Sequence, residues 1–107
     1  MIPQSFLVVI PAYNEGRVLS QMAEETVLFL RSHVRQFELI LVDDGSRDNT
    51  PLVIRTLEER FPEVSSILHR TNLGYGASLQ DGFFRCRFEW VFFTDADRKF
   101  QIWERPA

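Results

Sequence analysis

Short apolar runs alternate along this chain with stretches in which apolar residues recur at helical spacing. The runs lie at residues 6–10, 39–42, 64–68 and 90–93. Runs of four or five apolar residues are typical of strands that are buried on both faces, as in parallel sheets. The pattern therefore predicts four strands, of which the third has the weakest signal.

The stretches between the runs predict helices. Apolar positions fall on one helical face at residues 18–30, 52–61 and 77–84. Thr50 and Pro51 fit a helix start, with the hydroxyl as cap and proline where its missing N–H costs nothing. The resulting order, β-α-β-α-β-α-β, predicts an α/β, Rossmann-like fold with a mainly parallel sheet. In such sheets ligands bind beyond the carboxyl ends of the strands, so the residues just after each run are the informative ones.

Composition and charge exclude several classes of protein. A length of 107 residues suits one domain, since domains cluster at about 100–150 residues. The formal net charge of −3 lacks the basic surplus of a general nucleic-acid binder, so no nucleic-acid partner is expected. No run approaches the roughly 20 apolar residues of a membrane helix, and no secretory signal is recognisable. Cys86 is the only cysteine, which excludes an intrachain disulfide and favours a reducing compartment.

The first predicted strand is followed by a short polar segment, residues 11–15. A helix start explains two of its residues, with Asn14 as the cap and Glu15 in the favourable first turn. It does not explain Tyr13, because a turn has no need of a large aromatic side chain. Stacking of Tyr13 on a nucleotide base is the functional alternative.

Two adjacent carboxylates, Asp43 and Asp44, follow the second predicted strand. Their burial there is costly, because like charges repel and desolvation adds to the repulsion. A turn requires only one of them together with Gly45. A carboxylate at this place could accept hydrogen bonds from uracil, guanine or a ribose hydroxyl. The structural alternative is an Asx turn followed by a helix cap, which suffices for residues 48–50.

The loop after the third predicted strand carries Gly74 and Gly76, which permit close backbone approach. The dinucleotide-binding pattern G-x-G-x-x-G fails, because Leu79 occupies the third glycine position, and no P-loop is present. His69 and Arg70 are interpreted as no more than solvated strand-end residues.

The fourth predicted strand ends in the sharpest feature of the sequence, Asp95 and Asp97 separated by one residue. In an extended segment residues i and i+2 point the same way, so the two carboxylates would face one point. A divalent cation would relieve their repulsion, and hard oxygen ligands suit Mg²⁺ or Mn²⁺. We therefore expect a metal site at Asp95 and Asp97.

Together these motifs resemble the family 2 glycosyltransferases of the GT-A fold. The matching segments, in order and spacing, are residues 9–15, 38–50, 72–83 and 93–97. The glycine-rich third segment is most similar to dolichol- or polyprenyl-phosphate sugar synthases. The fold expected from the resemblance is the nucleotide-diphospho-sugar transferase type.

The resemblance implies a nucleotide-diphosphate sugar of UDP or GDP type as donor, and a polyprenyl or dolichyl phosphate as acceptor. It also implies a cytoplasmic enzyme, peripheral at the cytosolic membrane face in the full-length protein. An oligomer is compatible with the sequence. The site residues that it implies are Pro11, Tyr13 and Glu15 along the nucleoside pocket, Asp44 with Asp43 at the base or ribose, Asp95 near the ribose and metal, and Asp97 on the metal.

Two features depart from the family pattern. The family often has glutamine two residues after the second aspartate, where this chain has Lys99, with Gln101 beyond it. A lysine there would repel the metal or contact phosphate as a point charge. Beyond Gln101 the family pattern is lost, so we expect residues 1–107 to form the donor-binding part of an incomplete domain, without the acceptor-binding part. No catalytic base can be nominated.

Two other functions stay open at this point. One is a truncated, non-catalytic module that binds a nucleotide sugar or regulates a partner. The other is a sugar-1-phosphate nucleotidyltransferase, which is the weaker hypothesis, because those enzymes favour a basic glycine-rich loop directly after the first strand.

Overall fold

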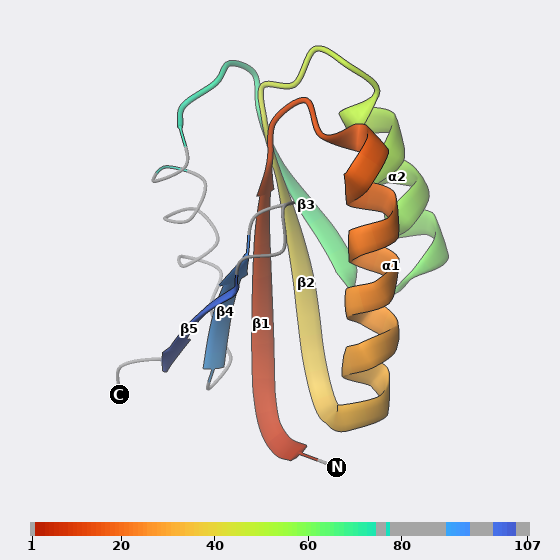
Figure 1. Ribbon diagram of the computed structural model, residues 1–107, viewed down its shortest axis with the longest axis vertical. Coiled ribbons are helices and arrows are strands. Elements are labelled where there is room, and N and C mark those ends of the chain that lie inside the picture. Colours follow the sequence, from red (N-terminus) through yellow and green to blue (C-terminus); the bar gives the residue numbers. More distant parts are fainter. Residues whose placement is uncertain (1, 75–76, 78–89, 95–99, 105–107) are drawn as a thin grey trace.

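The computed structural model describes residues 2–74, 77, 90–94 and 100–104, and Figure 1 shows how their elements are arranged. The helices are α1 (Gly16–His33) and α2 (Thr50–Arg60). The strands are β1 (Ile2–Ala12), β2 (Val34–Asp44), β3 (Val64–His69), β4 (Trp90–Thr94) and β5 (Phe100–Glu104). Each of the four predicted strands and the first two predicted helices is therefore confirmed. The helix predicted at 77–84 lies outside the described residues except for Ala77.

The five strands form one sheet in the order β3-β2-β1-β4-β5. The pairs β1–β2, β2–β3 and β1–β4 are parallel, and only β4–β5 is antiparallel. This confirms an α/β fold with a mainly parallel sheet. Strand β5 was not predicted, because its sequence mixes polar and apolar residues instead of forming an apolar run. Such mixing is common in antiparallel strands, which need not be buried on both faces.

The central strands are apolar throughout because both of their faces are buried. Leu39 and Leu41 of β2 lie on the face that α1 and α2 cover, together with Val8 and Ile10 of β1. Side chains alternate along a strand, so the intervening residues lie on the opposite face. There the buried cluster consists of Leu7, Val9, Ile40 and Val42, with Ile67 packed against it. Figure 1 shows the two helices side by side on one face of the sheet.

The starts of both helices differ from the predicted caps. Helix α1 begins at Gly16, so Glu15 precedes the helix and does not belong to its first turn. Asn14 is no cap either, because it adopts a positive φ of 52° and directs its side chain to another loop. Thr50 is the first residue of α2 and not its cap. These polar side chains bind a neighbouring loop, and sequence spacing along one helix does not reveal such a partner.

Truncation of a core residue tests this packing. Leu41 is fully buried, and Leu41→Ala should lower the free energy of unfolding by about 2–5 kcal/mol through lost burial and a new cavity. Urea unfolding followed by circular dichroism measures the loss. Leu52 is 62% exposed on α2, so Leu52→Ala is the control and should change the free energy by no more than about 0.5 kcal/mol. Equal losses in the two variants would contradict the described core.

Candidate functional site

The carboxyl ends of the parallel strands meet at one edge of the sheet. Ala12 of β1 is in register with Asp43 of β2, and Asp44 of β2 is in register with His69 of β3. The loops that follow these strands therefore start side by side. Strand β4 runs parallel to β1 as well, and Asp95 follows its last residue in the sequence. The predicted motifs consequently lead to a common edge.

Asn14 joins the loop after β1 to the loop after β2. Its backbone N–H donates to the hydroxyl of Ser46 at 2.9 Å, and its side-chain oxygen accepts from the N–H of Arg47 at 2.8 Å. Asparagine tolerates the left-handed conformation that this arrangement requires. The segment that contains Tyr13 is thus held in place by reciprocal hydrogen bonds.

A second set of bonds fastens the starts of the two helices to each other. The carboxylate of Asp48 accepts from the N–H of Thr50 at 2.9 Å and from the N–H of Gly16 at 3.4 Å. The hydroxyl of Thr50 donates to Asp48 and accepts from the N–H of Glu15 at 3.1 Å. These bonds hold the pKa of Asp48 below its usual value, with the Thr50 hydroxyl as the largest cause. The helix N-termini also favour a negative charge here.

Position 16 leaves little room for a side chain while Asn49 keeps its place. A Cβ atom there would lie 2.2 Å from the side-chain oxygen of Asn49, far inside van der Waals contact. Because Gly16 and Asn49 belong to the starts of α1 and α2, the close approach brings both helix N-termini to the same edge.

The three residues predicted after β1 differ in their exposure. Pro11 is buried within β1, whereas Tyr13 is 43% exposed. Glu15 is half-buried, and its Oε1 accepts from the N–H of Tyr13 at 3.3 Å. Tyr13 therefore stands on a braced loop with much of its side chain in solvent, as a stacking residue would.

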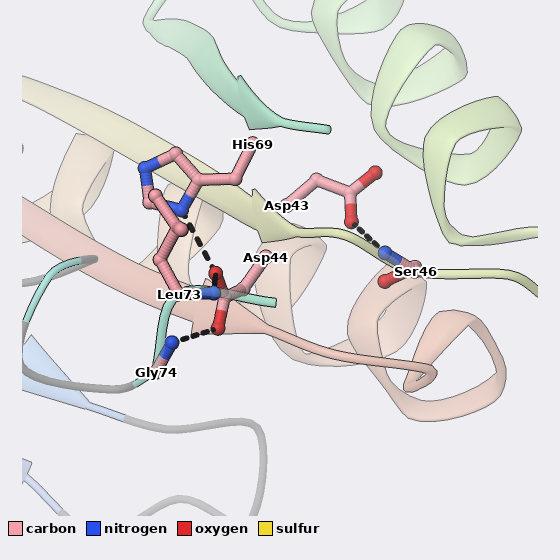
Figure 2. Close-up of polar contacts among 6 residues, drawn as sticks. All are labelled: Asp43, Asp44, Ser46, His69, Leu73 and Gly74. Carbon is pink, nitrogen blue, oxygen red and sulfur yellow. Dashed lines mark hydrogen bonds and ion pairs between the residues drawn. The ribbon is translucent and has the colours of Figure 1, made fainter. Parts of the chain in front are cut away.

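The two adjacent carboxylates diverge, as Figure 2 shows. Asp43 is 2% exposed, and its Oδ1 accepts from the N–H of Ser46 at 3.0 Å. Its Oδ2 is buried and has no hydrogen-bond partner among the described residues. A buried carboxylate oxygen without a partner is costly, so the site is suited to a donor group supplied by water or by a ligand.

Asp44 is buried too, but described donors surround it. Its Oδ1 accepts from Nδ1 of His69 and from the N–H of Leu73, both at 2.8 Å, and its Oδ2 accepts from the N–H of Gly74 at 2.9 Å. Burial acts to raise the pKa of this carboxyl group, but the three hydrogen bonds outweigh burial and hold the pKa below its usual value. Asp44 is therefore a stable anion at neutral pH.

His69 is not the solvated strand-end residue that we expected. It is 7% exposed at the end of β3 and pairs with Asp44. One signal in the sequence could have pointed to it, because a histidine stands at the end of a predicted strand. Its burial depends on register and on the loop at 70–74, neither of which is visible in a single sequence.

The loop at 70–74 lies tightly against the turn after β2. A Cβ atom on Gly45 would come within 2.5 Å of the backbone of Thr71 and Asn72, and Gly45 has a positive φ of 77°. Gly74 also has a positive φ, 95°, while its N–H reaches Asp44. Glycine therefore permits both the close contact and the chain direction.

The expected metal ligands, Asp95 and Asp97, lie outside the described residues, as does Lys99. In the part of the chain that the structure describes, no group of three or more His, Cys, Asp or Glu side chains could hold a metal ion. Over the same residues, no helix combines the length and the apolar character needed to span a bilayer.

Two solved structures have a similar fold. Mannosyltransferase PcManGT from Pyrobaculum calidifontis, solved in complex with GDP-Man and Mn²⁺, matches with a TM-score of 0.73 and 24% identity, over 91% of this chain and 28% of its own. S. aureus TarS 1-349 in complex with UDP-GlcNAc matches with a TM-score of 0.72 and 23% identity, over 87% of this chain and 26% of its own. At such identities the similarity shows the fold alone, which is GT-A-like.

The chain belongs to glycosyl transferase family 2, whose family model matches residues 7–101. A dolichyl-phosphate beta-glucosyltransferase of Trichomonas vaginalis, ALG5C, is 34% identical over 94 residues, which cover 83% of this chain and 28% of the relative. An undecaprenyl-phosphate 4-deoxy-4-formamido-L-arabinose transferase of Pseudomonas fluorescens is 40% identical over 92 residues, covering 84% of this chain and 27% of the relative. The predicted resemblance is confirmed. The chain spans little more than a quarter of the length of these relatives.

Removal of the charge on Asp44 should destabilise the chain in a pH-dependent way. Because the folded state lowers the pKa of Asp44, its stabilising effect is fully present above the ordinary value of about 3.9 and is lost as the pH falls through the lowered value. Asp44→Asn should therefore cost about 1–3 kcal/mol of unfolding free energy at pH 7 and less below pH 4. Urea unfolding across this range measures the difference.

Glu59→Gln is the matched control, since Glu59 is an exposed acid on α2. It should leave stability at pH 7 unchanged within about 0.5 kcal/mol. A loss for Asp44→Asn that stayed constant from pH 7 to pH 3 would contradict the role given to the charge.

Proposed function

We propose that this chain binds the nucleoside diphosphate part of a sugar donor at the carboxyl edge of its sheet. The observation that carries the proposal is the convergence of Tyr13, Asp43 and Asp44 at that edge, on loops that hydrogen bonds hold together. Membership of glycosyl transferase family 2 supports it. The proposed reaction breaks the bond between sugar and diphosphate and forms a bond from the sugar to an acceptor oxygen.

The chemistry of these three side chains suits a nucleoside. The exposed ring of Tyr13 offers a surface on which a base can stack. The Oδ2 of Asp43, which has no partner among the described residues, and the remaining acceptor capacity of Asp44 suit N–H groups of a base or ribose hydroxyls. Glu15 and Pro11 complete the proposed nucleoside pocket. Glu15 accepts a hydrogen bond from the N–H of Tyr13, and Pro11 belongs to the strand that precedes Tyr13.

We assign the diphosphate end of the donor to Asp95 and Asp97. Their carboxylates are the hard ligands that Mg²⁺ and Mn²⁺ prefer, and each metal needs only one or two of them besides phosphate oxygens. The mannosyltransferase with the same fold was solved with Mn²⁺ and a nucleotide sugar. A bound ion would stabilise the negative charge that develops on the departing diphosphate. In this proposal Lys99 contacts phosphate as a point charge.

The acceptor that we propose is a polyprenyl or dolichyl phosphate. This follows from the two curated relatives, whose names give dolichyl phosphate and undecaprenyl phosphate as the molecules they act on. A lipid phosphate resides at a membrane surface, so we place the full enzyme at the cytosolic face of a membrane, as a peripheral protein. The described residues supply the donor side of this reaction and no acceptor site.

Calorimetric titration of the chain with UDP and with GDP, each with and without Mn²⁺, tests the proposal. We expect one nucleotide to bind, with an affinity that rises when Mn²⁺ is present. Asp97→Asn should remove most of the metal dependence, whereas Glu59→Gln should behave like the parent. The proposal fails if a folded chain binds neither nucleotide, or if binding is indifferent to the substitution of Asp97.

Tyr13 allows a separate test of base stacking. Tyr13→Ala should weaken nucleotide binding by about 1–3 kcal/mol, which is the usual range for one aromatic–base contact. Tyr13→Phe keeps the ring and should bind within about twofold of the parent, since a twofold change is only about 0.4 kcal/mol. Because Tyr13 is 43% exposed, neither variant should shift the urea midpoint appreciably. Equal affinity of Tyr13→Ala and the parent would exclude stacking by this residue.

A further inference from the structure

We infer that His69 is a positioning residue for the donor-binding edge, acting through Asp44 on the loop segment Leu73–Gly74. The inference rests on the proposed function, because the edge matters only if a donor binds there. His69 itself is neither a proposed ligand contact nor a catalytic residue.

The geometry shows how His69 is linked to the loop after β3 through Asp44. It ends β3 in register with Asp44, the last residue of β2, and donates from Nδ1 to Oδ1 of Asp44 at 2.8 Å. The same carboxylate accepts the backbone N–H groups of Leu73 and Gly74. Figure 2 shows the imidazole and the two backbone amides around this one carboxylate. The carboxylate thus joins the ends of two strands to the loop that follows the second of them.

The placement of the pair argues against a role in stability alone. Asp44 and His69 are 4% and 7% exposed, and a buried ionisable pair contributes little net stability, since desolvation offsets the attraction. Such a pair does fix the orientation of the Asp44 carboxylate. Without the imidazole donor, Asp44 could rotate, and the two backbone amides alone would have to define its plane.

The orientation of Asp44 affects the proposed donor site. Asp44 is adjacent to Asp43, whose Oδ2 lacks a described partner, and Gly45 after it contacts the backbone at Thr71 and Asn72. A rotation of Asp44 would therefore loosen the 70–74 loop over this turn. We expect the orientation of the edge, and with it nucleotide affinity, to depend on the donor at position 69.

Two substitutions separate donation from packing. His69→Asn places a side-chain N–H donor at nearly the position of Nδ1, whereas His69→Leu fills similar space without a donor. In calorimetric titrations with UDP and GDP in the presence of Mn²⁺, we expect His69→Asn to bind within about threefold of the parent and His69→Leu to bind at least about tenfold more weakly, as for loss of one charge-assisted hydrogen bond. Parental affinity in His69→Leu would overturn the inference, and so would equal loss in both variants.

The amide resonances of Leu73 and Gly74 in the ligand-free chain give a readout that does not need nucleotide. Their downfield shifts, which report bonding to a carboxylate, should persist in His69→Asn and diminish in His69→Leu. Unchanged amides in His69→Leu would overturn the inference. If the amides respond as expected but no form of the chain binds nucleotide, the proposed function fails while the positioning of the loop stands.

A third variant covers the case in which His69→Leu does not fold. His69→Gln carries the same amide donor as asparagine on a side chain one methylene longer, so the donor overshoots Asp44. We expect His69→Gln to lose amide shift and affinity relative to His69→Asn. Equivalence of these two variants would overturn the inference.

Discussion

A buried carboxylate must find hydrogen-bond donors, and this requirement at Asp44 organises the edge of the sheet. Asp44 ends a central strand with neighbours on both sides and is 4% exposed, so solvent reaches little of its carboxylate. Instead, His69 arrives from the adjacent strand, and the chain after β3 bends back to present the N–H groups of Leu73 and Gly74. The loop therefore follows from the need of one carboxylate, and the positive φ of Gly74 is what allows it.

Strand geometry gives the neighbouring carboxylate a different environment. Successive side chains point to opposite faces, so Asp43 lies on the side of α1 and α2, and Asp44 lies on the side of Ile40 and Val42. Asp44 is surrounded by donors from its own chain, while one oxygen of Asp43 has no donor among the described residues. Two residues that look equivalent in the sequence thus differ in the acceptor capacity that remains for a ligand.

The elements of this fold were largely predictable, whereas the links between its loops were not. Continuous apolar runs reveal a strand such as β2, because burial on both faces leaves no room for polar residues. Strand β5 lacked that signal, since Phe100, Gln101 and Ile102 mix polar with apolar character. The cap predictions for Asn14 and Thr50 failed for a related reason. Each side chain binds a segment more than thirty positions away, and spacing within one helix carries no trace of it.

The candidate site likewise combines features that the sequence predicts with features that it does not. The positions of Tyr13, Asp43 and Asp44 at strand ends could be predicted, because parallel strands bring their carboxyl ends together. The support beneath them could not, because Ser46, Asp48 and His69 each have an ordinary structural explanation when taken alone. In the folded chain these three residues bind the loops that carry the candidate ligand contacts.

A family motif therefore combines residues of two kinds. Asn14 and Asp48 lie inside the segments that carry the resemblance, yet Asn14 accepts from the N–H of Arg47 and Asp48 accepts from the N–H of Gly16, in each case from another segment of the chain. Through these bonds the two side chains fix the residues beside them. The side chains proposed to contact a nucleoside directly are Tyr13, much of which is exposed, Asp43, whose Oδ2 has no partner among the described residues, and Asp44. The motif residues at this edge therefore include both proposed ligand contacts and residues that hold the loops together.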